Sequence, residues 1–464
     1  RVRNPLPFLK MSALEVASSR FEKGEGLINE ESFLTFLRQR ANEPGWLQNY
    51  RERNWRRFVD TPEASRRDEN WRFGDPKRLG IGKCMPFQGA VDESVASELR
   101  QNSNLLPAAA ARIVLLNDHC IEEAELSEDM RKQGLVFESL ESALLKHPEE
   151  IRPHLEAEES DLGSAKQIAL HNAHLRNGIY LRIPAGVIIE QTLVAYHWIE
   201  GADRAIFPRT IIDAGENSAV TLVEAYLSRD DEHAAFNCAV GSVKAGPQAN
   251  VCRISVQNQN LNTASFLLDS NNCSRAAKIN SVTLLMGSHS CRHESFLNLP
   301  EPDGEIRLRS MIAASGDQLF DQRSRQDHQA ERCTSDVLCK NALHDKARSV
   351  FAGLIRVDEK AQQTDAYQTN RNLVIGSAAE ADSMPGLEIL ANDVKCSHGA
   401  TTGRIDEEQL FYLKSRGIPT ETARQLLTLG FFEEILEESP DDLSETLRSL
   451  IREKFESGRA KGRS

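Results

Sequence analysis

The sequence lacks the features of a membrane protein and of a disordered chain. Aromatic residues make up only 6% of the 464 residues, and no stretch approaches 18 consecutive apolar residues, the length that suggests a membrane-spanning helix. Apolar residues nonetheless reach 40% and charged residues 27%, as in chains that fold around a core. We therefore predict a soluble globular protein, with about three structural units for this length.

Positive charge is in deficit. The chain has 56 Lys and Arg residues against 69 Asp and Glu residues, a net charge of -13. Such a charge repels phosphate backbones, so we expect no nucleic-acid partner. Residues 1–11 contain charges and prolines but no apolar segment of a secretion signal. We expect no membrane partner, and a location in the cytoplasm, or in an organelle stroma if a targeting segment has been removed.

Cysteines are few, odd in number and widely spaced. The nine cysteines lie between positions 84 and 396, unlike the dense, paired framework of a small disulfide-rich domain. We therefore expect reduced thiols.

The signatures of common hydrolytic enzymes are also missing. The Gly82-Lys83 pair has Lys77 where the first glycine of a P-loop belongs and Cys84 where its hydroxyl residue belongs. The sequence has no G-x-S-x-G, H-E-x-x-H or paired C-x-x-C motif. We predict that this chain does not hydrolyse nucleotide through a P-loop and is not a hydrolase or zinc enzyme of these classes.

The chain divides into three segments of different character. Residues 1–160 show mainly helical periodicity and predict an N-terminal helical domain. Residues 161–400 contain short β-branched runs such as Ile179–Ile183 and Val350–Val357, without the long helices of a doubly wound sheet. This middle segment predicts a stacked-strand solenoid, an irregular β-helix, with a long-looped β-sandwich as the alternative.

Residues 401–464 predict a C-terminal helical domain. Asp406 is placed to cap a first helix, and Gly417 is placed to end it. A second helix follows from Thr420, and a third begins where Pro440 takes the first helical position. The last seven residues form a small basic tail.

Two short motifs contain soft metal ligands. In the C-x-H motif of Cys396 and His398, an extended backbone places both side chains on one face, where thiolate and imidazole can converge on iron. The alternative is a buried thiol beside a hydrogen-bonded histidine. His289, Cys291 and His293 form H-x-C-x-H, a weaker three-ligand candidate. Its alternative is a polar outer face of the solenoid.

Several segments resemble the SufB/SufD family of iron-sulfur cluster assembly proteins. Residues 382–417 are similar to the family's core signature, and residues 345–355 and 368–373 are similar to its solenoid. The run RRDENWRF at 66–73 is similar to the N-terminal helical part of the SufD branch. The resemblance is strong over residues 320–436 and looser before them.

The residues around the C-x-H motif favour one branch of this family. Ser397 and Gly399 match the SufD branch, whereas SufB proteins typically carry glutamate at both places. The resemblance implies a right-handed parallel β-helix flanked by helical domains. It also implies assembly with a SufB-like subunit and a SufC-like ABC ATPase, in which nucleotide hydrolysis would reside. This chain is then a non-catalytic scaffold, and a nascent iron-sulfur cluster is shared transiently with SufB. Whether a flavin binds stays open.

The resemblance also implies roles for single residues. His398 matches the family histidine that faces a cysteine of SufB and helps hold the nascent cluster, and Cys396 matches the cysteine beside it. The helices between Asp406 and Leu436 match the region that docks SufC. Candidate anchors there are Phe411, Tyr412, Leu413, Leu426, Leu427 and Phe431. Their alternative is burial within the chain's own helices.

Two further functions compete with this scaffold. The chain can be a purely structural stabiliser of SufB and SufC that contributes no cluster ligand. Alternatively, a solenoid can be a carbohydrate-active enzyme, which needs clustered carboxylates such as Asp317, Asp321 and Asp327. Without SufB, we expect the β-helix edge to allow a homodimer.

Overall fold

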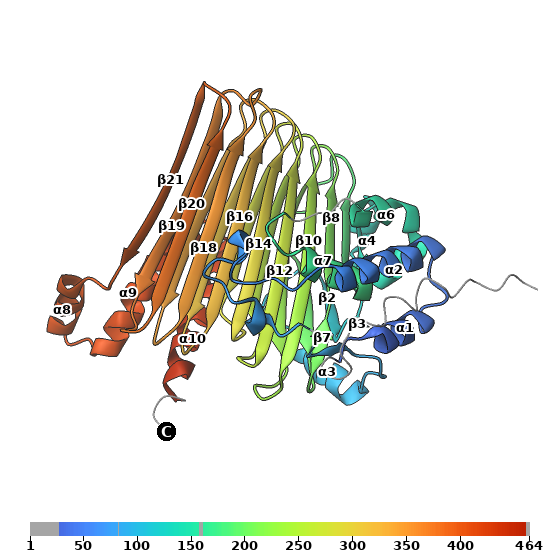
Figure 1. Cartoon of the computed structure of the whole chain (residues 1–464), viewed down its shortest axis with the longest axis horizontal. Helices are drawn as coiled ribbons and strands as arrows, with labels where there is room; N and C mark the ends of the chain where they lie inside the picture. The colour runs from blue at the N-terminus through green and yellow to red at the C-terminus, as the bar shows by residue number, and fades with distance from the viewer. Residues whose placement is uncertain (1–26, 82, 157–160, 461–464) are drawn as a thin grey trace, which may run out of the picture.

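Two parallel sheets form a β-solenoid. The computed structural model describes residues 27–81, 83–156 and 161–460, and eight successive strand pairs each give one strand to each sheet (Figure 1). The first sheet contains β5 (Gly178–Ile183), β8 (Arg209–Ala214), β10 (Ala235–Ala245), β12 (Thr263–Cys273), β14 (Ser290–Leu299), β16 (Leu319–His328), β18 (Arg348–Val357) and β20 (Glu380–Ile389). The second contains β6 (Leu193–Ile199), β9 (Ala219–Ser228), β11 (Asn250–Asn258), β13 (Lys278–Leu285), β15 (Glu305–Ala314), β17 (Thr334–Leu343), β19 (Thr364–Val374) and β21 (Val394–Gly403). The predicted solenoid is confirmed, and the β-sandwich alternative is wrong.

One turn residue in each successive rung has a left-handed backbone. These residues have φ between 54° and 66° and are Asn217, Gln248, Ala276, Asp303, Arg332 and Gln363. Each donates its N–H to a carbonyl of the following rung. Non-glycine residues seldom adopt this conformation, so the stacking of the rungs stabilises it.

Strands from the N-terminal segment close one end of the solenoid. β4 (Val136–Ser139) pairs antiparallel with β5, β2 (Ala111–Leu116) pairs parallel with β6, and β3 (His119–Glu122) pairs antiparallel with β2. The short strands β1 (Met85–Pro86) and β7 (Arg204–Ile206) pair with each other. The segment predicted as mainly helical therefore also supplies the strands that cap the sheets, because its β-rich run 111–116 is buried in the core.

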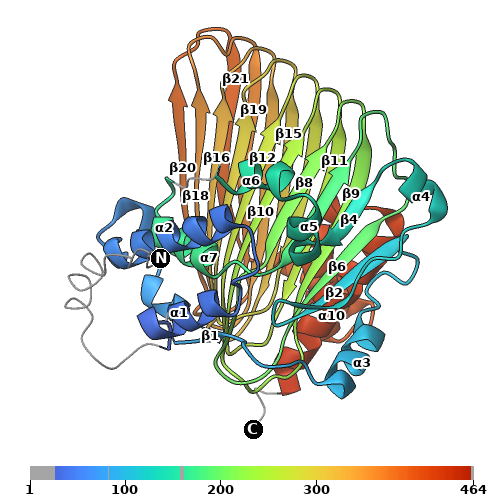
Figure 2. The same ribbon diagram turned by 90° about the vertical axis from the view of Figure 1, so that its right-hand side faces the viewer.

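Helices cover the outer faces of both sheets. The N-terminal set is α1 (Glu30–Arg38), α2 (Gly45–Asp60), η1 (Glu69–Trp71), η2 (Pro76–Leu79), α3 (Glu93–Asn102), α4 (Glu128–Lys132), α5 (Leu140–Lys146), α6 (Pro148–Glu156) and α7 (Ala165–His174). Of these, α2, α5, α6 and α7 lie over the first sheet (Figure 2). The part of the predicted helical domain before residue 27 lies outside the described residues.

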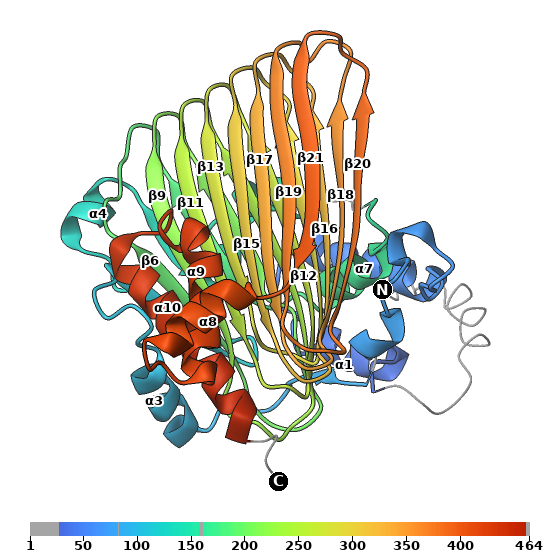
Figure 3. The ribbon, with the colours of Figure 1, turned by 90° about the vertical axis from the view of Figure 1, so that its left-hand side faces the viewer.

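The C-terminal helices lie over the second sheet (Figure 3). They are α8 (Glu407–Ser415), α9 (Thr420–Leu436) and α10 (Asp441–Ala460). The carboxylate of Asp406 accepts from the N–H groups of Glu408 and Gln409, and Gly417 has φ 83° after α8, so the predicted cap and stop are confirmed. The helix extends into the predicted basic tail as far as Ala460, and residues 461–464 lie outside the description. No helix among the described residues is long and apolar enough to cross a membrane.

The charged and aromatic run at 66–73 is fastened to the first sheet. The Arg292 guanidinium lies 3.8 Å from the Trp71 ring centre and donates to Asp321, Glu294 and the Leu162 carbonyl. A Cβ on Gly74 would lie 2.5 Å from an Asp321 oxygen, so glycine is required for this close approach. The run therefore attaches the N-terminal segment through a buried ionic cluster.

We expect Arg292→Met to be strongly destabilising. The substitution leaves the buried carboxylates of Asp321 and Glu294 without the positive charge of Arg292. Removal of one partner of a buried ion pair lowers the free energy of unfolding by about 3–5 kcal/mol. Denaturant unfolding monitored by tryptophan fluorescence measures the loss. The matched control is Arg332→Met, which removes an exposed pair with Asp303 and should change the midpoint little. Equal effects of the two variants would contradict a special role for the cluster.

Candidate functional site

The C-x-H motif lies at the open end of the solenoid. β20 and β21 are the last strands of their sheets, and each pairs on one side only, which leaves the end opposite β4 uncapped (Figure 1). Cys396 and His398 lie on β21 opposite Ala366 and Gln368 of β19. Register partners in a parallel pair point to the same face, so both side chains face the solenoid interior. The predicted shared face is confirmed.

The two side chains differ in exposure. Cys396 is half-buried against the apolar cluster of Ile355, Val357 and Ala366, and its burial, with Asp365 nearby, raises the pKa of the thiol. His398 is exposed. Within the described ranges, no group of three or more His, Cys, Asp or Glu side chains is arranged to hold a metal ion. Cys396 and His398 are the two soft metal ligands that β21 carries on its interior face.

The H-x-C-x-H residues lie in separate surroundings. The His289 Nε2 is 2.9 Å from the Arg78 carbonyl oxygen, outside the solenoid. Cys291 is buried in an apolar interior cluster, where burial raises the pKa of its thiol. The His293 Nε2 is 2.8 Å from Asp269 Oδ2 in the interior. The structure thus gives each of the three a different set of partners.

His293 belongs to a buried ionic network between the two sheets. Arg253 Nε donates to Glu224 at 2.6 Å, and its other nitrogen pairs with Asp269. His197 Nε2 lies 3.2 Å from Glu224. A Cβ on Gly241 would lie 2.7 Å from the Arg253 guanidinium. The network therefore fills the middle of the solenoid with paired charges. His293 is engaged with Asp269 in this network and is not held ready as a metal ligand.

This network predicts an acid-sensitive stability. Burial raises the pKa of Glu224, but Arg253 and His197 more than offset it and hold the pKa at about 2, below the usual value near 4.3. The resulting stabilisation is complete above about pH 4.3 and is lost as pH falls towards 2; it amounts to about 3 kcal/mol. We expect Glu224→Gln to lower the unfolding free energy at pH 7, with the deficit shrinking from pH 5 to 2. Denaturant titrations across this range measure it, with exposed Glu190→Gln as control. A deficit independent of pH would contradict the expectation.

The six predicted docking residues fall into two groups. Phe411, Tyr412 and Leu426 are exposed by 72%, 55% and 47%, and α8 projects from the body (Figure 1). Leu413, Leu427 and Phe431 are half-buried. Lys340 Nζ lies 5.3 Å from the Phe431 ring centre, so this ring is partly covered within the chain. The first group offers the free apolar surface.

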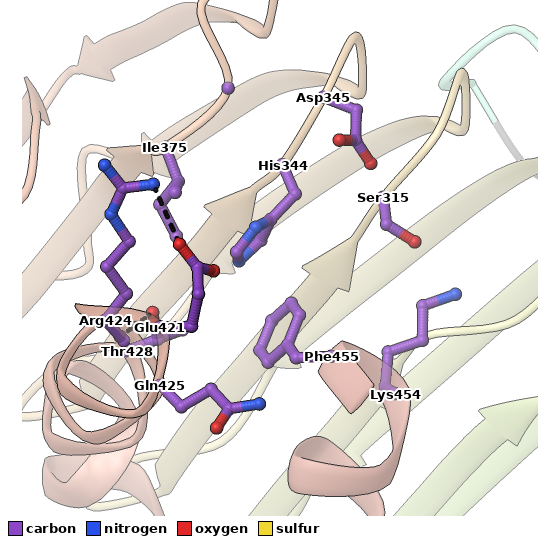
Figure 4. A pocket seen from close by; sticks show the side chains of 11 residues that line it. Ser315, His344, Asp345, Ile375, Glu421, Arg424, Gln425, Thr428, Lys454 and Phe455 are labelled. Carbon is purple, nitrogen blue, oxygen red and sulfur yellow. Dashed lines mark hydrogen bonds and ion pairs between the residues drawn. The ribbon is translucent and has the colours of Figure 1, made fainter. Parts of the chain in front are cut away.

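A pocket of about 220 Å³ lies between α9, α10 and the turns of the solenoid (Figure 4). Glu421, Arg424 and Thr428 line it from α9, and the ring centres of His344 and Phe455 lie 4.5 Å apart on its other side. The N-terminal half of α9 is therefore packed less tightly against the solenoid than its C-terminal half, whose apolar residues lie in the core.

The carboxylates considered for a carbohydrate-active site do not form an open groove. Asp321 is buried and bonded to Arg292 and Arg323. Asp327 is buried and paired with Arg325, and Asp317 is exposed beside Arg78. The two buried carboxylates are neutralised by arginine and carry structural contacts.

Two features of the open end escaped prediction from the sequence. Leu387, Ile389 and Leu390 at the end of β20 are exposed, although their apolar run suggests a buried strand. Gln368, the register partner of His398, is 1% exposed. The exposure of the three apolar residues and the pairing of Gln368 with His398 both follow from their position in the last rungs. The sequence alone could have indicated them only if the strand register had been known.

Comparison with known proteins supports the resemblance seen in the sequence. Residues 197–431, just over half of the chain, match the family described as "SUF system FeS cluster assembly, SufBD core domain". The chain is 28% identical to the iron-sulfur cluster assembly protein SufD of Escherichia coli (strain K12) over 84% of this chain and 89% of that protein. It is 26% identical to SufD of Bacillus subtilis (strain 168) over 93% and 99%. It is 25% identical to SufB of the same strain over 94% of each chain. The chain belongs to the SufB/SufD family, and its role lies in iron-sulfur cluster assembly.

Proposed function

We propose that this chain is a SufD-type scaffold subunit that joins a SufB-like subunit at its open end and a SufC-like ATPase at α8 and α9. The observation that carries the proposal is the uncapped end, where two unpaired strand edges meet the Cys396 and His398 pair. The cluster is cargo held between subunits. This chain contributes His398, with Cys396 beside it, and performs no catalysis of its own.

The open end has the chemistry of an interface. Both last strands are ten residues long, and Leu390 beside them is 56% exposed. A long unpaired edge with exposed apolar side chains tends to associate with another strand. The family includes SufB-named as well as SufD-named proteins, so we expect a SufB-like subunit to present a solenoid edge that can pair with this one. In the absence of SufB, the same edge is the surface for a homodimer.

The docking helices are linked directly to the last rungs. Glu434 of α9 pairs with Lys340 of β17 at 2.5 Å and with Arg371 of β19 at 2.9 Å. β19 is the strand next to β21. A displacement of α9 by a bound ATPase therefore acts, through one carboxylate, on the strand beside His398. The looser packing around the pocket under α9 gives the helix room for such a displacement.

The nine free thiols fit a reducing compartment, so we place the complex in the cytoplasm or an organelle stroma. Anaerobic co-purification of the three subunits, with iron and sulfide counted per complex, tests the function. A stable complex that carries a cluster is the expected result. Failure to bind a SufC-like ATPase would overturn the proposal, and a complex whose cluster content is independent of His398 would reduce this chain to a structural stabiliser.

A further inference from the structure

Three interior columns of the second sheet change from large apolar residues to small or polar residues towards the open end. On the second sheet, the interior positions of β15 include Ile306, Leu308 and Ile312. Two rungs later, on β19, the same columns carry Ala366, Gln368 and Asn372. The change is costly, because burying polar groups requires partners that an apolar core does not need. The amides in these columns therefore need hydrogen-bond partners.

Gln368 is the least satisfied of these amides. It is 1% exposed, and neither Oε1 nor Nε2 has a hydrogen-bond partner in the described part of the chain. Asn372, by contrast, donates to Asn370 at 2.6 Å and accepts from Asn341 at 2.8 Å. A buried amide group without a hydrogen-bond partner destabilises the folded chain.

The opposite strand is shaped to admit the Gln368 amide. A Cβ on Gly353 of β18 would lie 2.5–2.6 Å from Oε1, Cδ and Nε2 of Gln368. A side chain at position 353 would require the Gln368 amide to shift, so in the structure the amide occupies the space that the glycine leaves. The glycine thus gives the amide group room within the interior.

The next layer towards the open end contains His398. Gln368 and His398 are register partners on β19 and β21, and Gly353 and Pro385 are register partners on β18 and β20. Neighbouring strands are about 4.8 Å apart, a separation that a glutamine side chain can span. Among the described strands, none follows β21 in its sheet, and Gln368 lies in the layer directly beneath the histidine.

We propose that Gln368 is a positioning residue: its amide, which makes no hydrogen bond to His398 in the free chain, turns to the His398 ring when a partner subunit covers the open end and selects which ring nitrogen is available to the cluster. The inference rests on the proposed function of His398. A histidine ligand normally has its second nitrogen fixed by a hydrogen-bond partner, and the amide of Gln368 can donate to or accept from an imidazole. When a partner subunit covers the open end, the pair is removed from competing water.

The test compares Gln368→Leu with Gln322→Leu. Gln322 is also a buried interior glutamine with an unpartnered Oε1, but it lies on β16, away from His398. Histidine-selective ¹⁵N NMR of the free chain and of the three-subunit complex reports the His398 tautomer, and iron and sulfide counts report the cluster. We expect Gln368→Leu to change the tautomer populations in the complex and to lower cluster content about tenfold, and Gln322→Leu to do neither.

Each outcome separates the two proposals. An unchanged His398 tautomer and cluster in folded, assembled Gln368→Leu would overturn the positioning role and show that the amide is satisfied by water alone. Similar losses in the Gln322 control would also overturn it, because they indicate a general effect of the interior. If His398→Ala retains the cluster, the proposed function fails instead, whatever Gln368 does to the tautomer.

Discussion

We expect His398→Ala to separate assembly from cluster content. The variant should form the three-subunit complex in normal yield. The imidazole is exposed, and β21 is held in place by its backbone pairing with β19. Its iron and sulfide content should fall about tenfold or more, since even a hydrogen-bond partner of a metal ligand acts on that scale. Anaerobic purification followed by iron and sulfide assays and a visible spectrum provides the measurement.

Ser397→Ala is the matched control for this variant. Ser397 is the neighbouring exposed residue of β21, and its side chain points to the opposite face of the strand. Its removal should leave both assembly and cluster content unchanged. Normal cluster content in His398→Ala would contradict the ligand role and leave the chain as a stabiliser of its partners.

We also expect the double variant Phe411→Ala, Tyr412→Ala to lose the ATPase. Both residues are exposed on α8 and are large enough to act as central anchors of an interface. Removal of two aromatic anchors should weaken binding at least about 30-fold, the effect of about 2 kcal/mol. Titration of purified SufC-like ATPase by calorimetry measures the change, while thermal unfolding should be unaffected.

An exposed apolar residue elsewhere tests the specificity of this loss. Leu145 of α5 is 68% exposed, and α5 packs beside β4 and β5 at the capped end, whereas α8 follows β21 at the open end. Leu145→Ala should bind the ATPase as the unchanged chain does. Unaltered binding by the α8 variant would place the docking surface elsewhere, with Leu426 of α9 as the next residue to replace.

The features of the fold that follow from local chemistry were predictable. The cap at Asp406 and the stop at Gly417 depend on neighbours within four residues, and the structure has both. The strands at 111–139 were not predictable in the same way. They are short and lie among helices, and only their pairing with β5 and β6 makes them part of the sheets. The left-handed turn residues, such as Ala276 and Arg332, likewise depend on contacts between rungs.

The candidate site shows the same division. Alternation along an extended strand was sufficient to place Cys396 and His398 on one face. The same reasoning gave His289, Cys291 and His293 a common face, but His289 precedes β14 and contacts the Arg78 carbonyl outside the solenoid. Gln368 could not be connected with His398 from the sequence, because thirty positions separate them and only the register of β19 and β21 brings them together.

Hydrogen-deuterium exchange of this chain, alone and with its SufB-like partner, tests the central claim most directly. If the open end is the subunit interface, peptides covering β20 and β21 should exchange much more slowly in the complex, because unpaired edge amides gain partners. Peptides covering β3 and β4 at the capped end should not change. Protection at the capped end, with β20 and β21 unaffected, would contradict the account, since His398 would then face solvent and not a partner.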